Sequence, residues 1–293
     1  MQVAFHLGAY STDADQLVRT LHENDRLLRR RGICLPDPIA FRGVLRDTLT
    51  ALQGQPASAE TSSALCDALA VEQADDLRRL VLSHGNFLAQ PERIITAEGL
   101  YPLAAERIGP LANLFPDAQT EFHFALINPA LLVMALVTRQ HRRSYDEIMA
   151  GLSPTDLTWT PVVARMVEAA QGRRLTIWCN EDMPLILPEV VRAMAGLAAT
   201  DPLAGEFGML EQIMTPEGLT RLRDYLASRP PHSVAQRRKV VTAFLESYSL
   251  PDARELDLPL PGWTDELVED ITQGYDADVA RIAAMPGVTF LHP

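Results

Sequence analysis

The sequence predicts an α/β fold in which helices cover both faces of a central parallel sheet. Over the first 180 residues, short apolar runs that end in turn residues alternate with amphipathic segments. This alternation is typical of repeated strand–helix–strand units, whose strands pair in parallel. After residue 184 helical patterns dominate. We therefore expect one α/β domain over 1–293, with residues 185–285 mainly helical.

The elements of the N-terminal part begin with a strand over 3–7 that ends at Gly8. A helix follows, opened by the cap candidates Ser11 and Thr12 and ended by Gly32. The next predicted elements are a helix over 38–52, a polar loop over 54–63, a helix over 64–79 and a short strand over 80–82.

The middle and the C-terminal part continue the alternation and then become helical. Up to residue 180 the predicted elements are a weak strand at 94–95, a helix over 97–114, a strong strand over 120–127, an apolar helix from Pro129, a helix over 158–171 and a strand over 174–179. After residue 180 we predict helices that start at about 185, 202, 216, 233 and 264, followed by a last strand over 288–291. Two helix starts carry local signals. Ser144 and Glu147 have capping-box spacing, and Pro216 follows the cap candidate Thr215.

Composition excludes several functions. The chain has 293 residues and a net charge of −12, and an acidic surface repels phosphate backbones, so we expect no nucleic-acid partner. Of the 26 basic residues only Lys239 is a lysine, so no N-terminal phosphate-binding loop can use one. Nine carboxylates lie in 250–280, where we expect a solvated helix face.

The cysteines and the apolar segments predict a cytoplasmic protein. Three widely spaced cysteines without a CxxC pair favour a reducing compartment. We expect no signal peptide, because no basic segment precedes a long apolar run, and no membrane partner, because the longest apolar stretch covers only 129–137. The sequence also has no metal-spaced Cys/His cluster and no HExxH, GxSxG or GxxxxGK motif, so no metal site is predicted.

The loop after the first strand is the first candidate binding site, because ligands of open α/β sheets bind at the carboxyl ends of the strands. It consists of Gly8, Ala9, Tyr10, Ser11 and Thr12. Small residues and hydroxyl groups suit a phosphate, but the loop lacks a lysine and a second glycine. Asp13 and Asp15 would repel an anion from the helix N-terminus. An ordinary N-capped helix explains the same residues.

The segment from His6 to Leu35, HLGAYSTDADQLVRTLHENDRLLRRRGICL, resembles the opening of bacterial sulfotransferase-like proteins. Those chains begin with a strand, a His-Ile-Gly turn, a Lys-Thr-Gly-Thr-Thr type loop and a helix that ends at an Arg-Gly-Ile exit. The resemblance implies a P-loop NTPase/sulfotransferase-like fold. It also implies that the five loop residues would bind 3′-phosphoadenylyl sulfate, whose sulfuryl group would pass to a hydroxyl of a small molecule or glycan.

The sequence departs from the family at the residues that would hold this donor. Ser11 stands at the position of the loop lysine, and Asp13 at that of a glycine. The family's Arg-x-Pro element, which contacts the 3′ phosphate, corresponds to Ile127-Asn128-Pro129 here, with Ala135 at the position of its serine. The resemblance therefore implies a degenerate donor site. The alternative is a non-catalytic binding or interaction protein on the same scaffold.

His84 and Glu181 are the catalytic candidates, because each follows an apolar strand signal and belongs at the ligand-bearing edge. Either could act as a general base for an acceptor hydroxyl. A packed or surface histidine explains His84 equally well, as it does His6 and His123. For Glu181 the structural alternative is a cap of the helix that starts near Pro184.

Overall fold

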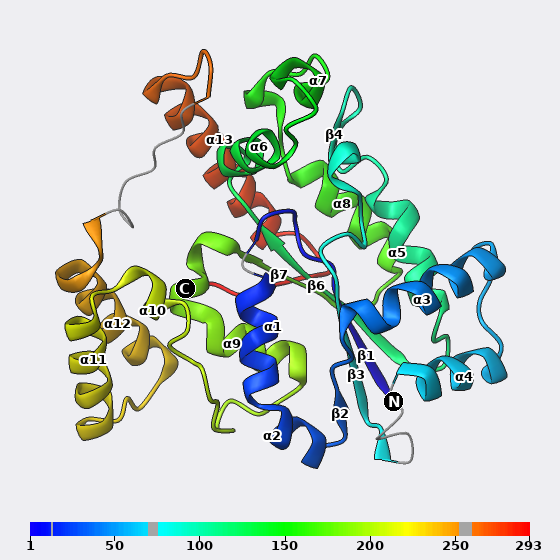
Figure 1. Cartoon of the computed structure of the whole chain (residues 1–293), viewed down its shortest axis with the longest axis horizontal. Coiled ribbons are helices and arrows are strands. Elements are labelled where there is room, and N and C mark those ends of the chain that lie inside the picture. Colours follow the sequence, from blue (N-terminus) through cyan, green and yellow to red (C-terminus); the bar gives the residue numbers. More distant parts are fainter. Residues whose placement is uncertain (13, 70–75, 252–259) are drawn as a thin grey trace.

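The computed structural model describes residues 1–12, 14–69, 76–251 and 260–293. Its centre is a six-stranded sheet in the order β2-β3-β1-β6-β7-β8, in which every pair of neighbours is parallel (Figure 1). The strands are β1 (Gln2–His6), β2 (Ile33–Cys34), β3 (Arg79–Ser83), β6 (Gln119–Leu126), β7 (Leu175–Cys179) and β8 (Val288–Phe290). The predicted α/β fold is confirmed.

Helices cover both faces of this sheet, because its strands are apolar on both sides. Ala4 packs with α1 (Ala14–Glu23), α2 (Asp25–Arg30) and α9 (Met183–Ala195) on one face. Its neighbour Phe5 points to the opposite face, where the larger core lies. The helices of that core are α3 (Pro38–Leu52), α4 (Ala59–Leu69), α5 (Ala104–Asn113), α6 (Pro129–Arg139), α8 (Thr160–Ala170) and α13 (Asp265–Ala283).

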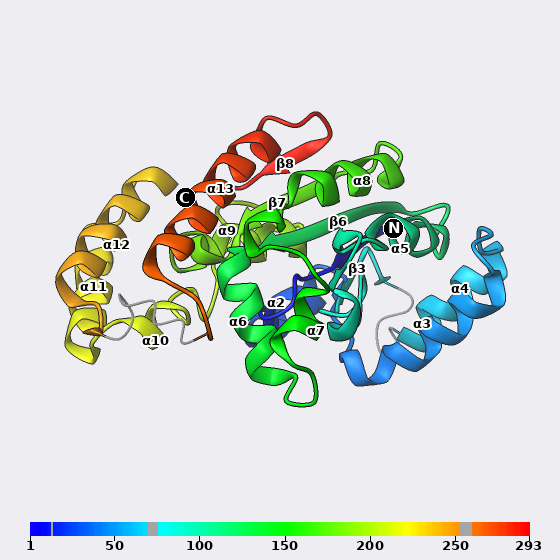
Figure 2. The same ribbon diagram turned by 90° about the horizontal axis from the view of Figure 1, so that it is seen from above.

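A smaller group of helices lies beside the sheet. It consists of α10 (Leu210–Ile213), α11 (Pro216–Ser228) and α12 (Val234–Tyr248), which bury a cluster of their own around Leu222 and Val241. Figures 1 and 2 both place α11 and α12 at the end of the molecule opposite α3 and α4. In the part of the chain that the structure describes, no helix combines the length and the apolar character needed to cross a membrane.

The helix starts with clear local signals form as predicted. In α7 (Tyr145–Met149) the Ser144 hydroxyl accepts the Glu147 backbone N–H, and the Glu147 carboxylate accepts the Ser144 N–H. At α11 the Thr215 hydroxyl accepts the Gly218 N–H. Side-chain caps satisfy backbone groups that the helix itself leaves without partners, so these starts depend on local sequence alone.

Several predicted boundaries are wrong. The predicted polar loop over 54–63 is helical from Ala59 onward, where α4 begins, and part of the predicted helix over 64–79 lies outside the described residues. The predicted helix over 97–114 begins only at Ala104. Before it, β4 (Ile95–Thr96) and β5 (Gly99–Leu100) form a separate antiparallel pair. Gly99, with φ of 110°, allows the turn that this pair requires.

Tertiary contacts explain two more differences. The helix predicted up to Gly32 breaks between α1 and α2, at Asn24. The Asn24 amide donates to the Ala204 carbonyl at 3.0 Å, and its oxygen accepts the Ala204 N–H at 2.9 Å. No helix starts near 202, because this segment packs closely on α1. A methyl group on Gly205 would meet the Glu23 carboxylate.

Candidate functional site

The loop from Gly8 to Thr12 lies at the carboxyl edge of the sheet, beside the loop that follows β3. Gly8 and Ser11 both have positive φ, 54° and 63°. Gly8 also packs on the neighbouring loop, since a methyl group added to it would lie 3.3 Å from the Gly85 Cα. The two loops therefore pack against each other, and Gly85 is flanked in the second loop by His84 and Asn86.

Two polar groups of the first loop, the Tyr10 N–H and the Thr12 hydroxyl, have partners within the protein. The Tyr10 backbone N–H donates to the buried Tyr101 hydroxyl at 2.9 Å. The Thr12 hydroxyl donates to the Ala9 carbonyl at 2.9 Å, and the Arg139 guanidinium lies over the Tyr10 ring at 5.7 Å. A phosphate-binding loop directs such groups at its ligand. Asp13, the predicted competitor for an anion, lies outside the described residues.

The segment that corresponds to the family's 3′-phosphate element is apolar and structural. Ile127 is 3% exposed, and its carbonyl accepts the Trp159 indole N–H at 2.8 Å. Ala135 is buried in α6. The Asn128 side chain caps α6 by accepting the Ala130 N–H at 2.9 Å. These residues do not fit a nucleotide phosphate, because they offer no cation at the positions where the resemblance places one.

Glu181 joins three elements at the far side of this edge. As a residue it is exposed, but its carboxylate turns back onto the protein, where it accepts the Asn128 N–H at 2.7 Å and the Tyr275 hydroxyl at 3.0 Å. Burial of the carboxyl raises its pKa, and the Asn128 hydrogen bond offsets part of that rise. The observed contacts connect the ends of β6 and β7 with α13.

His84 and Glu181 do not share one site. They follow β3 and β7, which are three strand spacings apart, or roughly 14 Å at the usual separation of strands. Side chains of this size cannot act on the same reacting atom across that distance without a large ligand between them. His84, in contrast, lines a cavity, so the two predicted catalytic residues have different surroundings.

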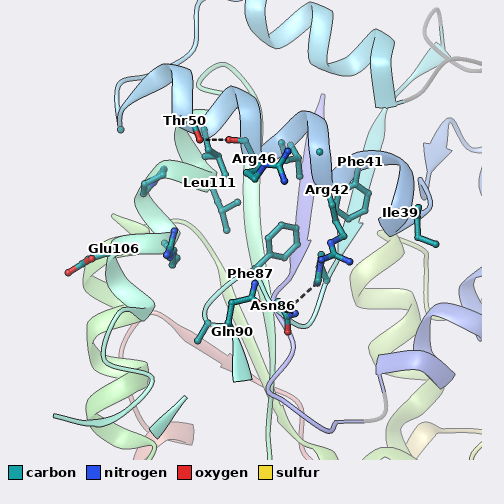
Figure 3. A pocket seen from close by; sticks show the side chains of 18 residues that line it. Ile39, Phe41, Arg42, Arg46, Thr50, Asn86, Phe87, Gln90, Glu106 and Leu111 are labelled. Atoms are coloured by element: carbon teal, nitrogen blue, oxygen red, sulfur yellow. Dashed lines mark hydrogen bonds between the residues drawn. The ribbon is translucent and has the colours of Figure 1, made fainter. Parts of the chain in front are cut away.

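That cavity, which we call the α3–α5 cleft, has a volume of about 730 Å³. It lies between α3, the loop of residues 84–90 and α5 (Figure 3). Apolar and aromatic side chains form its floor: Phe41, Leu45, Leu49, Phe87 and Leu111. Charged lining residues are Arg42, Arg46, Arg107 and Glu106. Its size and its combination of an apolar floor with polar groups around it are typical of small-molecule sites.

The hydrogen bond at His84 sets which nitrogen can serve a ligand. The Asn86 backbone N–H donates to His84 Nδ1 at 3.0 Å. Partial burial lowers the pKa of the imidazole, and the nearby Arg42 charge lowers it further, so the ring is neutral at pH 7. A neutral ring whose Nδ1 accepts carries its proton on Nε2. His84 in this arrangement is a hydrogen-bond donor toward the cleft.

The other two histidines considered as bases are buried within the sheet. His6 Nδ1 lies 2.8 Å from the Ser83 hydroxyl, and burial lowers the pKa of His6 to about 3. His123 Nε2 lies 2.9 Å from Glu121, which also forms an ion pair with buried Arg79. Neither histidine lines the α3–α5 cleft. Their contacts are those of an internal polar network.

The sequence analysis missed the residues of α3 and α5 that complete the cleft. Phe41 and Leu45 follow the helical period of a core-facing stripe, and Arg42 beside them resembles any solvated arginine. No motif distinguishes them. Only the packing of α3 against the loop after β3 brings Arg42 next to His84. The fold is α/β, and the cleft is a cavity beside the carboxyl edge of its parallel sheet.

Comparison with known proteins gives one structural similarity. No protein-family model matches the sequence, and no curated protein matches it. Among solved structures, the chain is similar to a sulfotransferase from Alicyclobacillus acidocaldarius, with 14% sequence identity and a TM-score of 0.42. The similarity covers 83% of this chain and 98% of that one.

Proposed function

We propose that the chain is a sulfotransferase-like protein that binds a small molecule in the α3–α5 cleft and no longer uses 3′-phosphoadenylyl sulfate. The observation that carries this proposal is the use of donor-site groups by the protein itself. The Tyr10 N–H donates its hydrogen bond to the Tyr101 hydroxyl, and Ile127 and Ala135 are buried in the apolar core. The α3–α5 cleft is lined by none of these residues.

The energetic argument follows from how sulfuryl transfer works. The transferred group carries charge on its oxygens, so catalysis depends on positioned donors and cations. Loss of one such donor commonly costs about 10²–10³ in rate. Here Ser11 and Ile127 stand at the positions of two cations, and Ala135 at that of a hydroxyl. Little activity with this donor is expected from a site that lacks all three.

Sulfuryl transfer to a hydroxyl of a small molecule or glycan is the second candidate function. The contact between Gly8 and Gly85 favours it, because it places the cleft that contains His84 next to the first loop. An acceptor in the cleft would then lie beside the group to be transferred. In this case His84 would have to accept a proton at Nε2, so the ring's own proton would have to lie on Nδ1. The Asn86 N–H would then lose Nδ1 as its hydrogen-bond acceptor.

Calorimetric titration with 3′-phosphoadenosine 5′-phosphate separates the two functions. We expect no binding to the wild-type protein at micromolar concentrations. We expect measurable affinity in the double variant Ser11→Lys, Asp13→Gly, which restores a cation and removes a carboxylate. The matched control Ser63→Lys, Asp67→Asn changes the net charge equally on the exposed face of α4 and should bind no better than wild type.

Two results would contradict the proposal. Micromolar affinity of the wild-type protein that is lost in Thr12→Ala would show a working donor site. Unchanged affinity in the Ser11→Lys, Asp13→Gly variant would show that the correspondence between this loop and the sulfotransferase loop is wrong.

A further inference from the structure

The floor of the α3–α5 cleft offers an extended apolar surface. The Phe41 and Phe87 rings stack with centroids 6.2 Å apart and an interplanar angle of 11°. Leu45 and Leu111 are each only 2% exposed, and Leu49 joins them. Figure 3 shows Phe87 and Leu111 in the middle of the cleft. Because Phe41, Leu45 and Leu111 are almost completely covered already, a ligand removes apolar area from water mainly at the half-buried Phe87 and Leu49.

The charges around this floor are mainly positive, although the whole chain carries −12. Arg46 pairs with Asp47 at 3.0 Å. Arg42 and Arg107 form no ion pair with any residue that the structure describes. Glu106 is the carboxylate among the lining residues, and Figure 3 shows it at the end away from Arg42. The cleft therefore favours an anion near Arg42.

Arg42 and His84 provide donors of matching chemistry at this end. The guanidinium presents a fixed set of N–H donors that suits a planar carboxylate. His84 adds the Nε2–H, because its Nδ1 is occupied by the Asn86 N–H. Phe41 and Phe87 lie directly beside this histidine, with ring centroids 6.5 and 5.6 Å from its own. One ligand can therefore contact both donors and the aromatic floor.

We propose that the α3–α5 cleft binds an organic anion with an apolar body, of the kind represented by a medium-chain carboxylate. Arg42 and His84 Nε2–H bind the carboxylate, and the chain lies on Phe87 and Leu49, which are the half-buried side chains of the floor. This inference rests on the proposed small-molecule function and names its ligand class. It differs from the neutral hydroxyl acceptor that sulfuryl transfer would require.

Calorimetry with decanoate, kept below its critical micelle concentration, tests the ligand class against its neutral counterpart 1-decanol. We expect decanoate to bind with a dissociation constant below 1 mM and 1-decanol to bind much more weakly. Added salt should weaken the binding of decanoate but not that of 1-decanol. Arg42→Gln should weaken decanoate binding by about tenfold or more, the usual effect of one charge-assisted hydrogen bond. The control Arg142→Gln removes the same charge from an exposed turn and should change nothing.

A second variant tests the location independently of charge. Gly43 lines the cleft within α3, and a side chain added there would meet no atom within 4 Å of its Cβ. Gly43→Leu should therefore fold, with a circular dichroism melting temperature at or above that of wild type, since leucine is the better helix former. Its side chain should project into the cleft and weaken decanoate binding.

The outcomes separate this inference from the proposed function. Equal affinity for 1-decanol and decanoate, or undiminished decanoate binding in Arg42→Gln, would overturn the anion class while leaving a small-molecule cleft. Undiminished binding in Gly43→Leu would overturn the location. If neither decanoate nor 1-decanol binds, the inference fails, and the nucleotide titration then decides the proposed function separately.

Discussion

Asp278 is a buried carboxylate of α13 that holds the N-terminus of α8. It is 1% exposed and accepts the backbone N–H groups of Trp159 and Thr160, the latter at 2.9 Å, as well as the Thr160 hydroxyl. Arg281 lies 3.3 Å away but is largely exposed. We expect the loss of this carboxylate to destabilise the protein strongly, because it joins the last helix to the start of another.

The magnitude follows from the donors that lose their acceptor. In Asp278→Ala the two backbone N–H groups stay where they are, and that of Trp159 cannot reach water because the residue is 0% exposed. A buried donor without a partner costs about 1–3 kcal/mol. The Thr160 hydroxyl can rotate to another acceptor, so the two N–H groups dominate. Asp278→Ala should lower the free energy of unfolding by about 3–5 kcal/mol.

The conservative variant sharpens this prediction. In Asp278→Asn the amide oxygen can accept both N–H groups, and the NH₂ group can donate to the Thr160 hydroxyl. Only the charge assistance is lost, so the expected cost is about 1 kcal/mol. The control Asp276→Ala, an exposed position two residues away, should stay within about 0.5 kcal/mol of wild type.

Urea unfolding followed by tryptophan fluorescence measures all three variants, with the free energy of unfolding obtained by linear extrapolation. Trp159 lies at the perturbed helix start and reports directly on it. A cost below about 1 kcal/mol for Asp278→Ala, or equal costs for the Ala and Asn variants, would refute the reasoning, because unsatisfied N–H groups would then not be the cause.

Further predictions concern the first loop, pH and thiol chemistry. In urea unfolding, Gly8→Ala should lower the free energy of unfolding by about 1–2 kcal/mol, because φ at Gly8 is 54° and Gly85 lies close. A methyl group on Gly85 meets no atom, so Gly85→Ala should cost less, and equal costs would contradict this explanation. Stability should fall as pH drops from 6.5 toward 3, because the unfolded chain protonates His6 while burial holds its folded pKa at about 3. This group contributes at most about 1.4 kcal/mol per pH unit. Urea titrations across this range should show a shallower fall for His6→Gln, and an unchanged slope would contradict the assignment. Burial raises the pKa of Cys179 to about 12 and also raises that of Cys66, but Cys66 is only half-buried. Iodoacetamide at neutral pH should therefore label Cys66 before Cys179, and equal labelling of the two in peptide mass spectra would refute this.

The fold could be predicted from local patterns to a large extent. The apolar runs of β1, β6 and β7 are buried strands, because a parallel sheet covered on both faces needs no polar alternation. Helix starts such as those at Ser144 and Thr215 depend on a few neighbouring residues. The break at Asn24 was not predictable, because its cause is a contact with Ala204, which is 180 residues away.

The candidate site could be predicted only in part. The rule that ligands bind at strand ends pointed to the first loop and to His84, and both lie at this edge. It also pointed to Glu181, whose carboxylate is bound to Asn128 and Tyr275 and is remote from the cleft. Arg42 carried no signal, because a helical arginine beside a core stripe is ordinary until the neighbouring loop is placed.

The sequence by itself determined the α/β class and most helix starts. It also determined that residue 11, in the first loop, is a serine and neither a lysine nor an arginine. These properties depend on residue type and short spacing. Only the tertiary structure decided which polar side chains are used internally and which line a cavity. Asp278 belongs to an acidic segment expected to be solvated, yet it is buried as a helix cap. Arg42, an exposed residue of α3, lines a cleft. The physical reason is that hydrogen bonding and burial depend on segments far apart in the chain, which local periodicity does not encode.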